Sequence, residues 1–480
     1  MYAPLDPKFL ATPEGQEAQR ILRACVHCGF CLATCPTYQL LGNELDSPRG
    51  RIYLMKSLLE GGAVSPLTQQ HLDRCLTCRA CESTCPSGVQ YGRLVDIGRA
   101  QVEARVARPA LARFQRWILK SVLPQPLLFR PLMLAGRMVR PLLPRSFRRK
   151  VPAYRSPGSW PPPRHGRRML VLAGCVQPTL APGINAAAAR LLDRLGISLV
   201  STPRAGCCGA LAHHLADEEA AREAMRRNID AWWPLVEQGG VEAIVVTASG
   251  CGTEIKEYGF HLRHDPAYSD RAQQISALTR DISEALLHAL DTCDLGQEAL
   301  LGEGHTEART TTRVAFHSPC SLQHGQKIKG VVEGLLQRAG ATLTPVPDGH
   351  LCCGSAGTYS LLQPELSRKL QANKIAALEH GSPDIILTDN IGCLMHLAAG
   401  TDTAVQHWVE WLDACLSGDH KGNAQGHQQH AAHGEPGERF IEAEKGDQGS
   451  DGGNEIEQAG HAGGRIPAQE AVEQGHRAHG

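Results

Sequence analysis

The stretch RACVHCGFCLATCPT, residues 23–37, decides the fold of the N-terminal part of the chain. It carries four cysteines at spacings of three, three and four residues, and a proline follows the last of them. The pattern returns as DRCLTCRACESTCPS, residues 73–87, with each cysteine 50 positions beyond its counterpart. Thiols repeated in register in this way indicate a pair of related metal sites.

The spacing C-x2-C-x2-C-x3-C-P is the one with which bacterial ferredoxins bind [4Fe–4S] clusters. Three cysteines in a short loop wrap one cluster, and in two-cluster ferredoxins the fourth binds the other cluster. Zinc is the alternative, but four-cysteine zinc sites usually combine two separated pairs. The sequence therefore predicts two [4Fe–4S] clusters, one bound by Cys25, Cys28, Cys31 and Cys85 and the other by Cys75, Cys78, Cys81 and Cys35.

Length and composition limit the classes of protein to which the chain can belong. Its 480 residues are too many for one hydrophobic core, and its 42% hydrophobic and 20% charged residues are typical of globular proteins. A disulfide framework would suit small secreted domains, and the first residues lack the basic and apolar regions of a secretory signal. We therefore expect a cytoplasmic protein in which the 18 cysteines are reduced.

The residues between the two cysteine runs predict a helix. In SPRGRIYLMKSLLEGG, residues 47–62, Ser47 is a candidate N-cap, Pro48 suits the first helical position and Gly61 suits a stop. Helices around the cysteine loops indicate a helical ferredoxin domain, which we place at residues 1–100. Arg49 and Arg51 are candidates to donate hydrogen bonds to a cluster or a partner, and for either one alone we expect a solvated first turn.

The remainder of the chain contains an internal repeat of cysteine motifs. GCVQP, GCCGAL and SGCGTE, which begin at residues 174, 206 and 249, have counterparts in PCSLQ, LCCGSAG and IGCLMH. The first three cysteines of each set are offset by 145 residues and the last by 142. We predict two CCG modules, module 1 at residues 168–300 and module 2 at residues 301–415. Their repeated cysteines are Cys175, Cys207, Cys208 and Cys251, and Cys320, Cys352, Cys353 and Cys393.

Each module alternates strand-like and helix-like segments, which indicates an α/β layer with a parallel sheet. Short apolar runs end at the cysteines, where parallel sheets place their sites, so the eight thiols are candidates for an additional redox or metal site. Buried small side chains are the alternative for these thiols. We interpret Cys293 and Cys415 as structural. The histidines beside the motifs, His213, His214, His317 and His324, are packing residues or proton carriers.

With these motifs the chain resembles the iron–sulfur subunits of bacterial glycolate oxidase, also called glycolate dehydrogenase. The resemblance covers residues 21–412 and includes ILRACVHCGFC, SPRGRIYL, RNIDAWW and HLCCGSAGTYS. It implies an oxidoreductase subunit that takes electrons from FAD-binding-type subunits, which oxidise glycolate to glyoxylate, and passes them towards an acceptor such as quinone. No flavin is expected on this chain, because it has no nucleotide-binding glycine motif after a predicted strand.

Other functions stay open at this point. The electrons could come from lactate or glycerol 3-phosphate, or the CCG modules could reduce a disulfide themselves. In heterodisulfide reductase, a more distant relative of the motif, the last cysteine belongs to a C-x-x-C pair that helps to hold a cluster. Here Glu254 and His396 stand in place of its second cysteine, and carboxylate or imidazole can also ligate iron.

Residues 101–167 predict a basic, proline-rich linker. Between residues 101 and 168 there are 16 Lys or Arg and only one acid, Glu103. Its apolar stretch at 117–144 is interrupted by charges and prolines, so it does not span a membrane. The composition suits a partner groove or the cytoplasmic face of the inner membrane as a peripheral contact, with a solvated linker as the alternative. Without a recognisable binding module, we expect no nucleic-acid partner.

Residues 416–480 are rich in Gly, His, Gln and Glu, and the sequence predicts a disordered tail to which we assign no function. The expected fold class is therefore multi-domain, α and α/β. A helical two-cluster ferredoxin domain comes first, and two repeated α/β cysteine-rich modules follow it.

Overall fold

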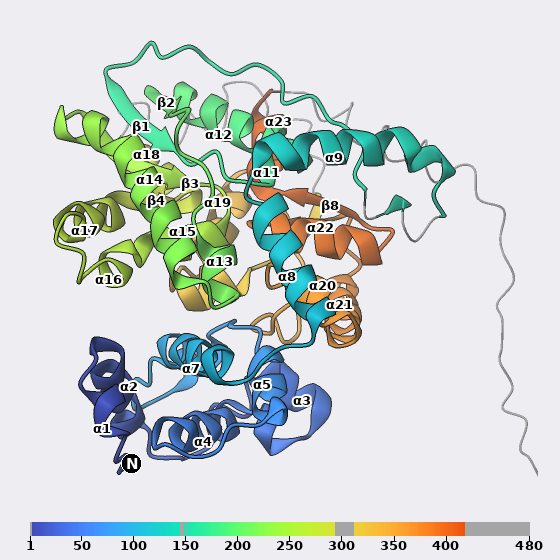
Figure 1. The fold of residues 1–480 in the computed structure, drawn as a ribbon. Helices are drawn as coiled ribbons and strands as arrows, with labels where there is room; N and C mark the ends of the chain where they lie inside the picture. Colours follow the sequence, from blue (N-terminus) through green and yellow to red (C-terminus); the bar gives the residue numbers. More distant parts are fainter. Residues whose placement is uncertain (1, 145–147, 150, 293–311, 418–480) are drawn as a thin grey trace, which may run out of the picture. The chain divides into compact units, whose positions relative to one another are not determined.

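The computed structural model describes residues 2–144, 148–149, 151–292 and 312–417. A helical N-terminal part, drawn in blue in Figure 1, precedes two parallel four-stranded sheets. This agrees with the predicted fold class. The predicted tail begins two residues too early, because residues 416 and 417 are helical. The rest of that tail and the interpretation of Cys293 as structural lie outside the described residues.

The N-terminal part is helical, and none of residues 2–106 lies in a strand. The predicted helix forms at Pro48–Leu59, where the Ser47 hydroxyl accepts a hydrogen bond from the Gly50 N–H (2.9 Å) and Gly61 follows with a left-handed φ of 91°. The elements are α1 (Pro7–Leu10), α2 (Pro13–Ala24), α3 (Pro36–Leu41), η1 (Glu44–Asp46), α4 (Pro48–Leu59), α5 (Pro66–Asp73), α6 (Ala80–Thr84) and α7 (Tyr91–Arg105).

Helices α4 and α7 pack closely in the core of this part. Gly98 on α7 makes the approach possible, because a Cβ there would lie 2.5 Å from the Met55 sulfur on α4. The core also includes Cys25, Cys75 and Cys81, so the cysteine loops are anchored in the same apolar cluster as the helices.

The segment that the sequence predicts as a linker contains two helices, α8 (Ala110–Val122) and α9 (Pro126–Val139), and a short turn η2 (Arg140–Leu142). Pro131 lies inside α9, and large apolar side chains on both helices are exposed. Among the described residues, no helix is long and apolar enough to cross a membrane.

Module 1 contains a parallel sheet with strand order β2-β1-β3-β4. Its strands are β1 (Arg167–Val171), β2 (Ile197–Ser201), β3 (Val241–Val246) and β4 (Thr279–Asp281). The helices are α11 (Gln177–Leu180), α12 (Gly183–Arg194), α13 (Ala210–His214), α14 (Glu218–Glu237), α15 (Ser249–Lys256), α16 (Tyr258–His261), α17 (Ser269–Leu278) and α18 (Ile282–Asp291).

Module 2 repeats this topology with strand order β6-β5-β7-β8, again all parallel. Its strands are β5 (Arg313–His317), β6 (Thr342–Leu343), β7 (Ile385–Thr388) and β8 (Ala404–His407). The helical elements are η4 (Ser321–Gly325), α19 (Val331–Arg338), α20 (Tyr359–Leu362), α21 (Pro364–Glu379), α22 (Ile391–Gly400) and α23 (Trp408–Ser417).

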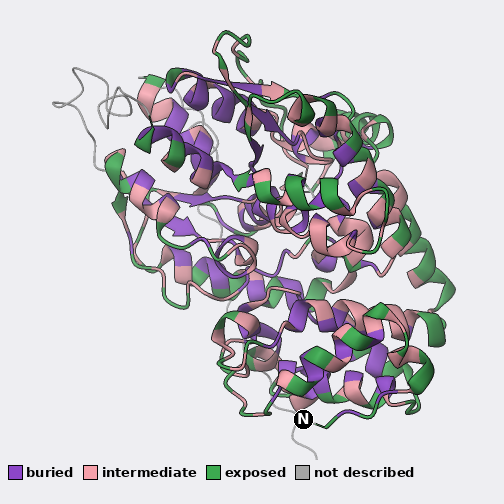
Figure 2. Ribbon diagram, turned by 90° about the vertical axis from the view of Figure 1, so that its left-hand side faces the viewer, coloured by how far each residue is buried: buried purple, intermediate pink, exposed green. Residues whose placement is uncertain are grey.

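The two modules share one hydrophobic core. Helix α23 packs against α12 of module 1, and Leu192 and Trp408 belong to the same buried cluster. Cys415 packs against this cluster. Figure 2 shows that the strands are mostly buried. In each sheet the chain reverses its direction of growth between the first and third strands, and parallel sheets bind ligands beyond the carboxyl ends at such a point.

Candidate metal centres

The two cysteine runs adopt the same backbone path. In the first, His27 and Gly29 have left-handed φ values of 55° and 85°; in the second, Thr77 and Arg79 have values of 51° and 60°. Non-glycine residues adopt this region only where the surrounding structure enforces it. The reversal turns backbone N–H groups towards the thiols, as in the 3.4 Å contact from the Thr77 N–H to the Cys75 sulfur.

Cysteines of both runs line a first pocket, which has about 440 Å³ of empty space and is partly open to solvent. Cys85, which ends α6, joins the loop cysteines of the first run there. Apolar and aromatic side chains form much of the remaining wall, together with the partly exposed Arg49. The cysteines lining this pocket are Cys25, Cys28, Cys31, Cys81 and Cys85.

A second pocket of about 310 Å³ has the reciprocal lining. Cys35, which precedes α3, joins the loop cysteines of the second run, Cys75, Cys78 and Cys81. Each pocket thus contains three loop cysteines of one run and the last cysteine of the other, and Cys81 borders both pockets. Four thiols with N–H donors around them fit the donor set that a [4Fe–4S] cluster requires.

Arg51 lines the second pocket. Its side chain is 1% exposed, and its guanidinium lies 4.0 Å from the Cys35 sulfur and 3.1 Å from the Thr37 hydroxyl. Burial opposes the charged form, but negative charge on the neighbouring cysteines, Cys75 foremost, and on Asp46 raises the pKa of Arg51 above its ordinary value. The expectation of a solvated Arg51 is wrong, because the first turn of α4 faces the cysteine loops. Arg49 is about one-third exposed and pairs with Glu44.

Asp46 is the acceptor for the cations around the second pocket. Its buried carboxylate lies 3.4 Å from the Arg51 guanidinium, 3.0 Å from His71 Nδ1 and 3.0 Å from the Arg74 guanidinium. Its backbone carbonyl accepts a hydrogen bond from Thr37 (3.0 Å). The sequence analysis missed this network, since nothing in the spacing of these residues relates them to the cysteines.

In module 1 the paired cysteines form a hydrogen-bonded thiol group. The Cys207 sulfur accepts hydrogen bonds from Cys175 and Cys208, which lower the pKa of the Cys207 thiol well below its usual value. Asn228 of the RNIDAWW stretch holds this loop, because its amide donates to the Cys207 carbonyl (2.9 Å) and accepts from the Gly206 N–H (2.9 Å). Cys251 lies in the first turn of α15 and interacts with Cys208.

Glu254, one of the two residues in place of the missing cysteines, forms a buried ion pair with His213 (3.1 Å). Burial alone would lower the pKa of His213, but Glu254 and Asp96 raise it to about 10. Burial alone would raise the pKa of Glu254, but His213 lowers it to about 2. The two sequence-predicted residues therefore neutralise each other. His261 completes a group of potential ligands within 4.8 Å there.

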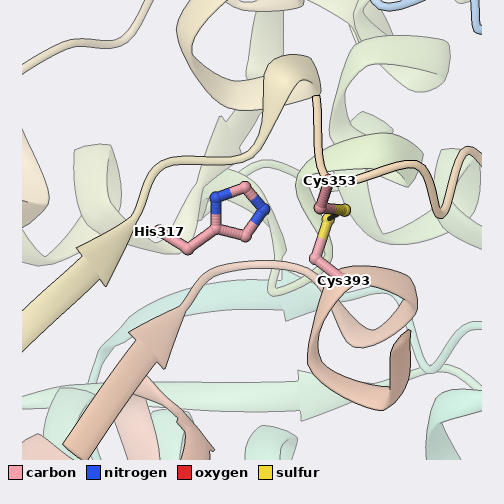
Figure 3. A group of neighbouring side chains, drawn as sticks. All are labelled: His317, Cys353 and Cys393. Carbon is pink, nitrogen blue, oxygen red and sulfur yellow. Dashed lines mark hydrogen bonds between the residues drawn. The ribbon is translucent and has the colours of Figure 1, made fainter. Parts of the chain in front are cut away.

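Module 2 places its thiols in two pairs. The Cys320 and Cys352 sulfurs are 3.8 Å apart, and the Cys353 and Cys393 sulfurs are 3.5 Å apart. A hydrogen bond to Cys352, together with burial, raises the pKa of the Cys320 thiol. Figure 3 shows the imidazole of His317 beside the second pair.

Two further histidines of module 2, His396 and His324, have hydrogen-bond partners. His396 Nε2, at the second missing-cysteine position, lies 3.3 Å from the Ser367 hydroxyl. His324 Nε2 donates to the His350 carbonyl (2.9 Å), which leaves Nδ1 to accept from the Ser83 hydroxyl (2.9 Å). His324 therefore links module 2 to α6 of the second cysteine run.

The second pocket adjoins the first thiol pair of module 2. Leu76, Cys352 and Tyr359 belong to one buried cluster, against which Cys78 and Cys320 pack. The Tyr359 hydroxyl donates to the Arg74 carbonyl (3.2 Å). Apolar packing between these loops brings module 2, by way of Cys320 and Cys352, next to the ferredoxin domain.

Comparison with known proteins places these features in known families. Residues 21–89 match a family model described as a 4Fe-4S dicluster domain, and residues 169–256 and 314–398 match one described as a cysteine-rich domain, CCG. The glycolate oxidase iron-sulfur subunit of Escherichia coli K12 is 54% identical over 401 residues, which cover 83% of this chain and 95% of that protein.

Two further relatives are more distant. A probable glycolate oxidase iron-sulfur subunit of Bacillus subtilis is 31% identical, over 79% of this chain and 88% of that protein. Lactate utilization protein A of Bacillus licheniformis is 26% identical, over 46% of this chain and 87% of that protein.

The buried pair in module 1 predicts a pH-dependent stability. The raised pKa of His213 stabilises the fold fully below about pH 6.5, and this contribution is lost as pH rises towards 10. The lowered pKa of Glu254 stabilises the fold above about pH 4.5, and that contribution is lost as pH falls towards 2. We expect Glu254→Gln to lower the free energy of unfolding by about 3–5 kcal/mol at pH 6 and by less at pH 9.

Urea unfolding followed by circular dichroism at both pH values measures this difference. Glu242→Gln is the matched control, because Glu242 forms a partly exposed pair with Arg167 (2.7 Å) and should change stability by at most about 1 kcal/mol. An equal loss for Glu254→Gln at pH 6 and pH 9 would show that the pair is not charged in the folded protein.

Proposed function

Because the chain belongs to the family of glycolate oxidase iron–sulfur subunits, we propose that it transfers electrons within such a complex. It receives them from FAD-binding-type subunits that oxidise glycolate to glyoxylate, and it passes them to a quinone. The observation that carries this proposal is the pair of pockets lined reciprocally by cysteines of the two runs. The name of the Escherichia coli relative supports glycolate as the source of the electrons.

We propose that the chain holds two [4Fe–4S] clusters with crossed ligands. The composition of the two pocket walls supports this assignment, since the last cysteine of each run lies in the pocket of the other. When bound, such clusters supply one-electron carriers whose potentials depend on hydrogen bonds and burial. The first would be held by Cys25, Cys28, Cys31 and Cys85, and the second by Cys75, Cys78, Cys81 and Cys35.

Arg51 is proposed to balance the negative charge of the second ligand set. Its guanidinium is buried and close to Cys35, and Tyr91 donates a hydrogen bond to the Cys75 sulfur (3.7 Å). Positive charge and hydrogen bonds near thiolates favour the reduced state of a cluster. The first pocket is partly open and has no buried arginine of this kind in its lining. The two bound clusters would therefore differ in redox potential.

Paired serine substitutions test the crossed ligation. If Cys25 and Cys85 serve one cluster, Cys25→Ser/Cys85→Ser should lose about four of eight irons, as either single variant does. Cys25→Ser/Cys35→Ser should lose nearly all of the iron, because it damages both sites. Iron and sulfide analysis after anaerobic purification, with EPR of the reduced protein, measures this. The reverse outcome, in which the second double variant keeps half of the iron, would mean that each run binds its own cluster.

Substrate-dependent reduction tests the proposed electron source. In the complex of the full chain with its flavin subunits, anaerobic glycolate should produce the EPR signals of reduced clusters. Lactate adds one methyl group, and we expect it to act about 10–200-fold more slowly, with glycerol 3-phosphate slower still. The isolated chain should not respond to glycolate. Faster reduction by lactate would reassign the substrate, and glycolate-dependent quinone reduction without the eight cysteines would refute the electron-transfer role.

We propose that α8 and α9 form the contact with an anionic membrane surface. Arg113 and Arg130 are exposed among apolar side chains, and this combination binds to the interface of anionic bilayers. Leu111, Phe114 and Trp117 follow one another at helical spacing on α8 and are 68%, 55% and 59% exposed. A quinone acceptor would be reached at such a surface.

Vesicle sedimentation tests the membrane contact. The full chain should bind vesicles containing phosphatidylserine more tightly than vesicles of phosphatidylcholine alone. Phe114→Glu/Trp117→Glu should weaken this binding at least about 10-fold, since each aromatic side chain contributes roughly 1.5–3 kcal/mol when buried. Tyr53→Glu on α4, which changes a residue that is 62% exposed outside this surface, is the control and should bind normally. Equal binding by the double variant would contradict the contact.

A further inference from the structure

Three potential metal ligands meet at the carboxyl edge of the module 2 sheet. His317 ends β5, Cys353 lies in the loop after β6 and Cys393 lies in the first turn of α22. Their ligand atoms lie within 4.8 Å of one another. The three side chains are 2%, 1% and 7% exposed, so they form a buried group (Figure 3).

His317 has polar atoms that no described residue satisfies. Neither Nδ1 nor Nε2 has a hydrogen-bond partner among the described residues. Buried polar groups are almost always hydrogen-bonded, and leaving one unpaired costs about 1–3 kcal/mol. A buried imidazole without hydrogen bonds, next to two cysteine sulfurs, indicates that the ring nitrogen binds a group such as a metal ion.

Rigid elements position the three side chains. The strand end that carries His317 pairs in register with Thr388 on β7. The Asn390 side chain caps α22 by accepting hydrogen bonds from the Gly392 and Cys393 N–H groups (2.8 and 3.4 Å). The residue after Cys353, Gly354, is pressed onto α21, where a Cβ would lie 2.8 Å from the Ser367 carbonyl oxygen. The group is therefore fixed before any ligand binds.

Module 1 provides an internal comparison. Its residue at the offset of 145 from His317 is Leu172, which follows β1 and packs in an apolar cluster with Cys208. The two modules otherwise share strand order, the paired cysteines and the cysteine in the following helix. A histidine thus replaces a core leucine in one repeat only, at the position that faces the thiols.

We propose that His317, Cys353 and Cys393 bind one zinc-type divalent metal ion, with the fourth tetrahedral position left to a non-protein ligand. Thiolate and imidazole are the ligands that zinc prefers, and two cysteines with one histidine form a known three-ligand set for zinc. Two thiolates neutralise a divalent ion, so the buried complex carries no net charge, which limits the cost of desolvation. The site is separate from both cluster pockets and does not depend on the substrate of the complex.

Metal analysis of the full chain tests the proposal. After anaerobic purification we expect about one zinc per chain in addition to the iron of the clusters. His317→Leu restores the residue that module 1 carries at this position, so the variant should fold. It should lower the affinity for Zn²⁺ or Co²⁺ by at least about 10-fold, since even outer-shell changes cost 10–100-fold. Co²⁺ should give thiolate-to-metal charge-transfer absorption that His317→Leu abolishes.

Matched variants separate this site from the rest of the protein. Cys353→Ser and Cys393→Ser should behave as His317→Leu does, whereas Cys208→Ser and Cys251→Ser in module 1 should retain the ion. Cluster EPR signals should be unchanged in all five variants, so failure here would leave the proposed function intact. Zinc that persists in His317→Leu, a Cys353–Cys393 disulfide in the purified chain, or extra iron and sulfide lost with His317 would each overturn the proposal.

Discussion

The buried carboxylate of Asp46 is the interaction on which the N-terminal part of the molecule depends. It joins Arg51 of α4 and Arg74 at the end of α5, while its backbone carbonyl holds Thr37 beside Cys35. A buried charge is costly unless it is paired and hydrogen-bonded, so the arginines and the aspartate are stable only together. This pairing holds the last cysteine of the first run next to the loop of the second, and together they line the second pocket.

Much of this architecture was predictable because local chemistry determines it. Ser47 and Pro48 specify the start of α4 wherever the helix packs, and apolar runs that end in Gly-Cys predict strand ends in both modules. The cysteine spacing likewise predicts two short loops that each bring three thiols together. Helix α9 was missed because Pro126 and Pro131 suggest breaks, although the first is accommodated at the helix start and the second within the exposed helix.

Contacts between distant residues could not be read from the sequence. Glu254 and His213 lie 41 positions apart (254 − 213), and only the packing of α13 against α15 brings them together. His317 was recognised as a neighbour of Cys320 in sequence, yet in the fold it faces Cys353 and Cys393. The one available signal was the comparison between repeats, in which a histidine stands against Leu172.

The two modules show how a duplicated fold can diverge at its binding edge. In module 1, hydrogen bonds from neighbouring thiols lower the pKa of the Cys207 thiol, and Glu254 forms a buried ion pair with His213. In module 2 the thiols form two separate pairs, one beside the ferredoxin domain and one beside an imidazole. The two sheets share one core and have the same strand order, whereas the loops beyond the strands differ.

The reciprocal lining of the two pockets has a consequence for the order of synthesis and cluster insertion in the cell. The ribosome releases Cys85 60 residues after Cys25 (85 − 25), which corresponds to roughly 3–12 s at ordinary rates of translation. During that interval the first loop has no closing thiol, so cofactor delivered to it would meet an incomplete shell exposed to oxygen. With the proposed crossed ligands, completion of either centre would therefore begin only after the second loop has emerged and folded.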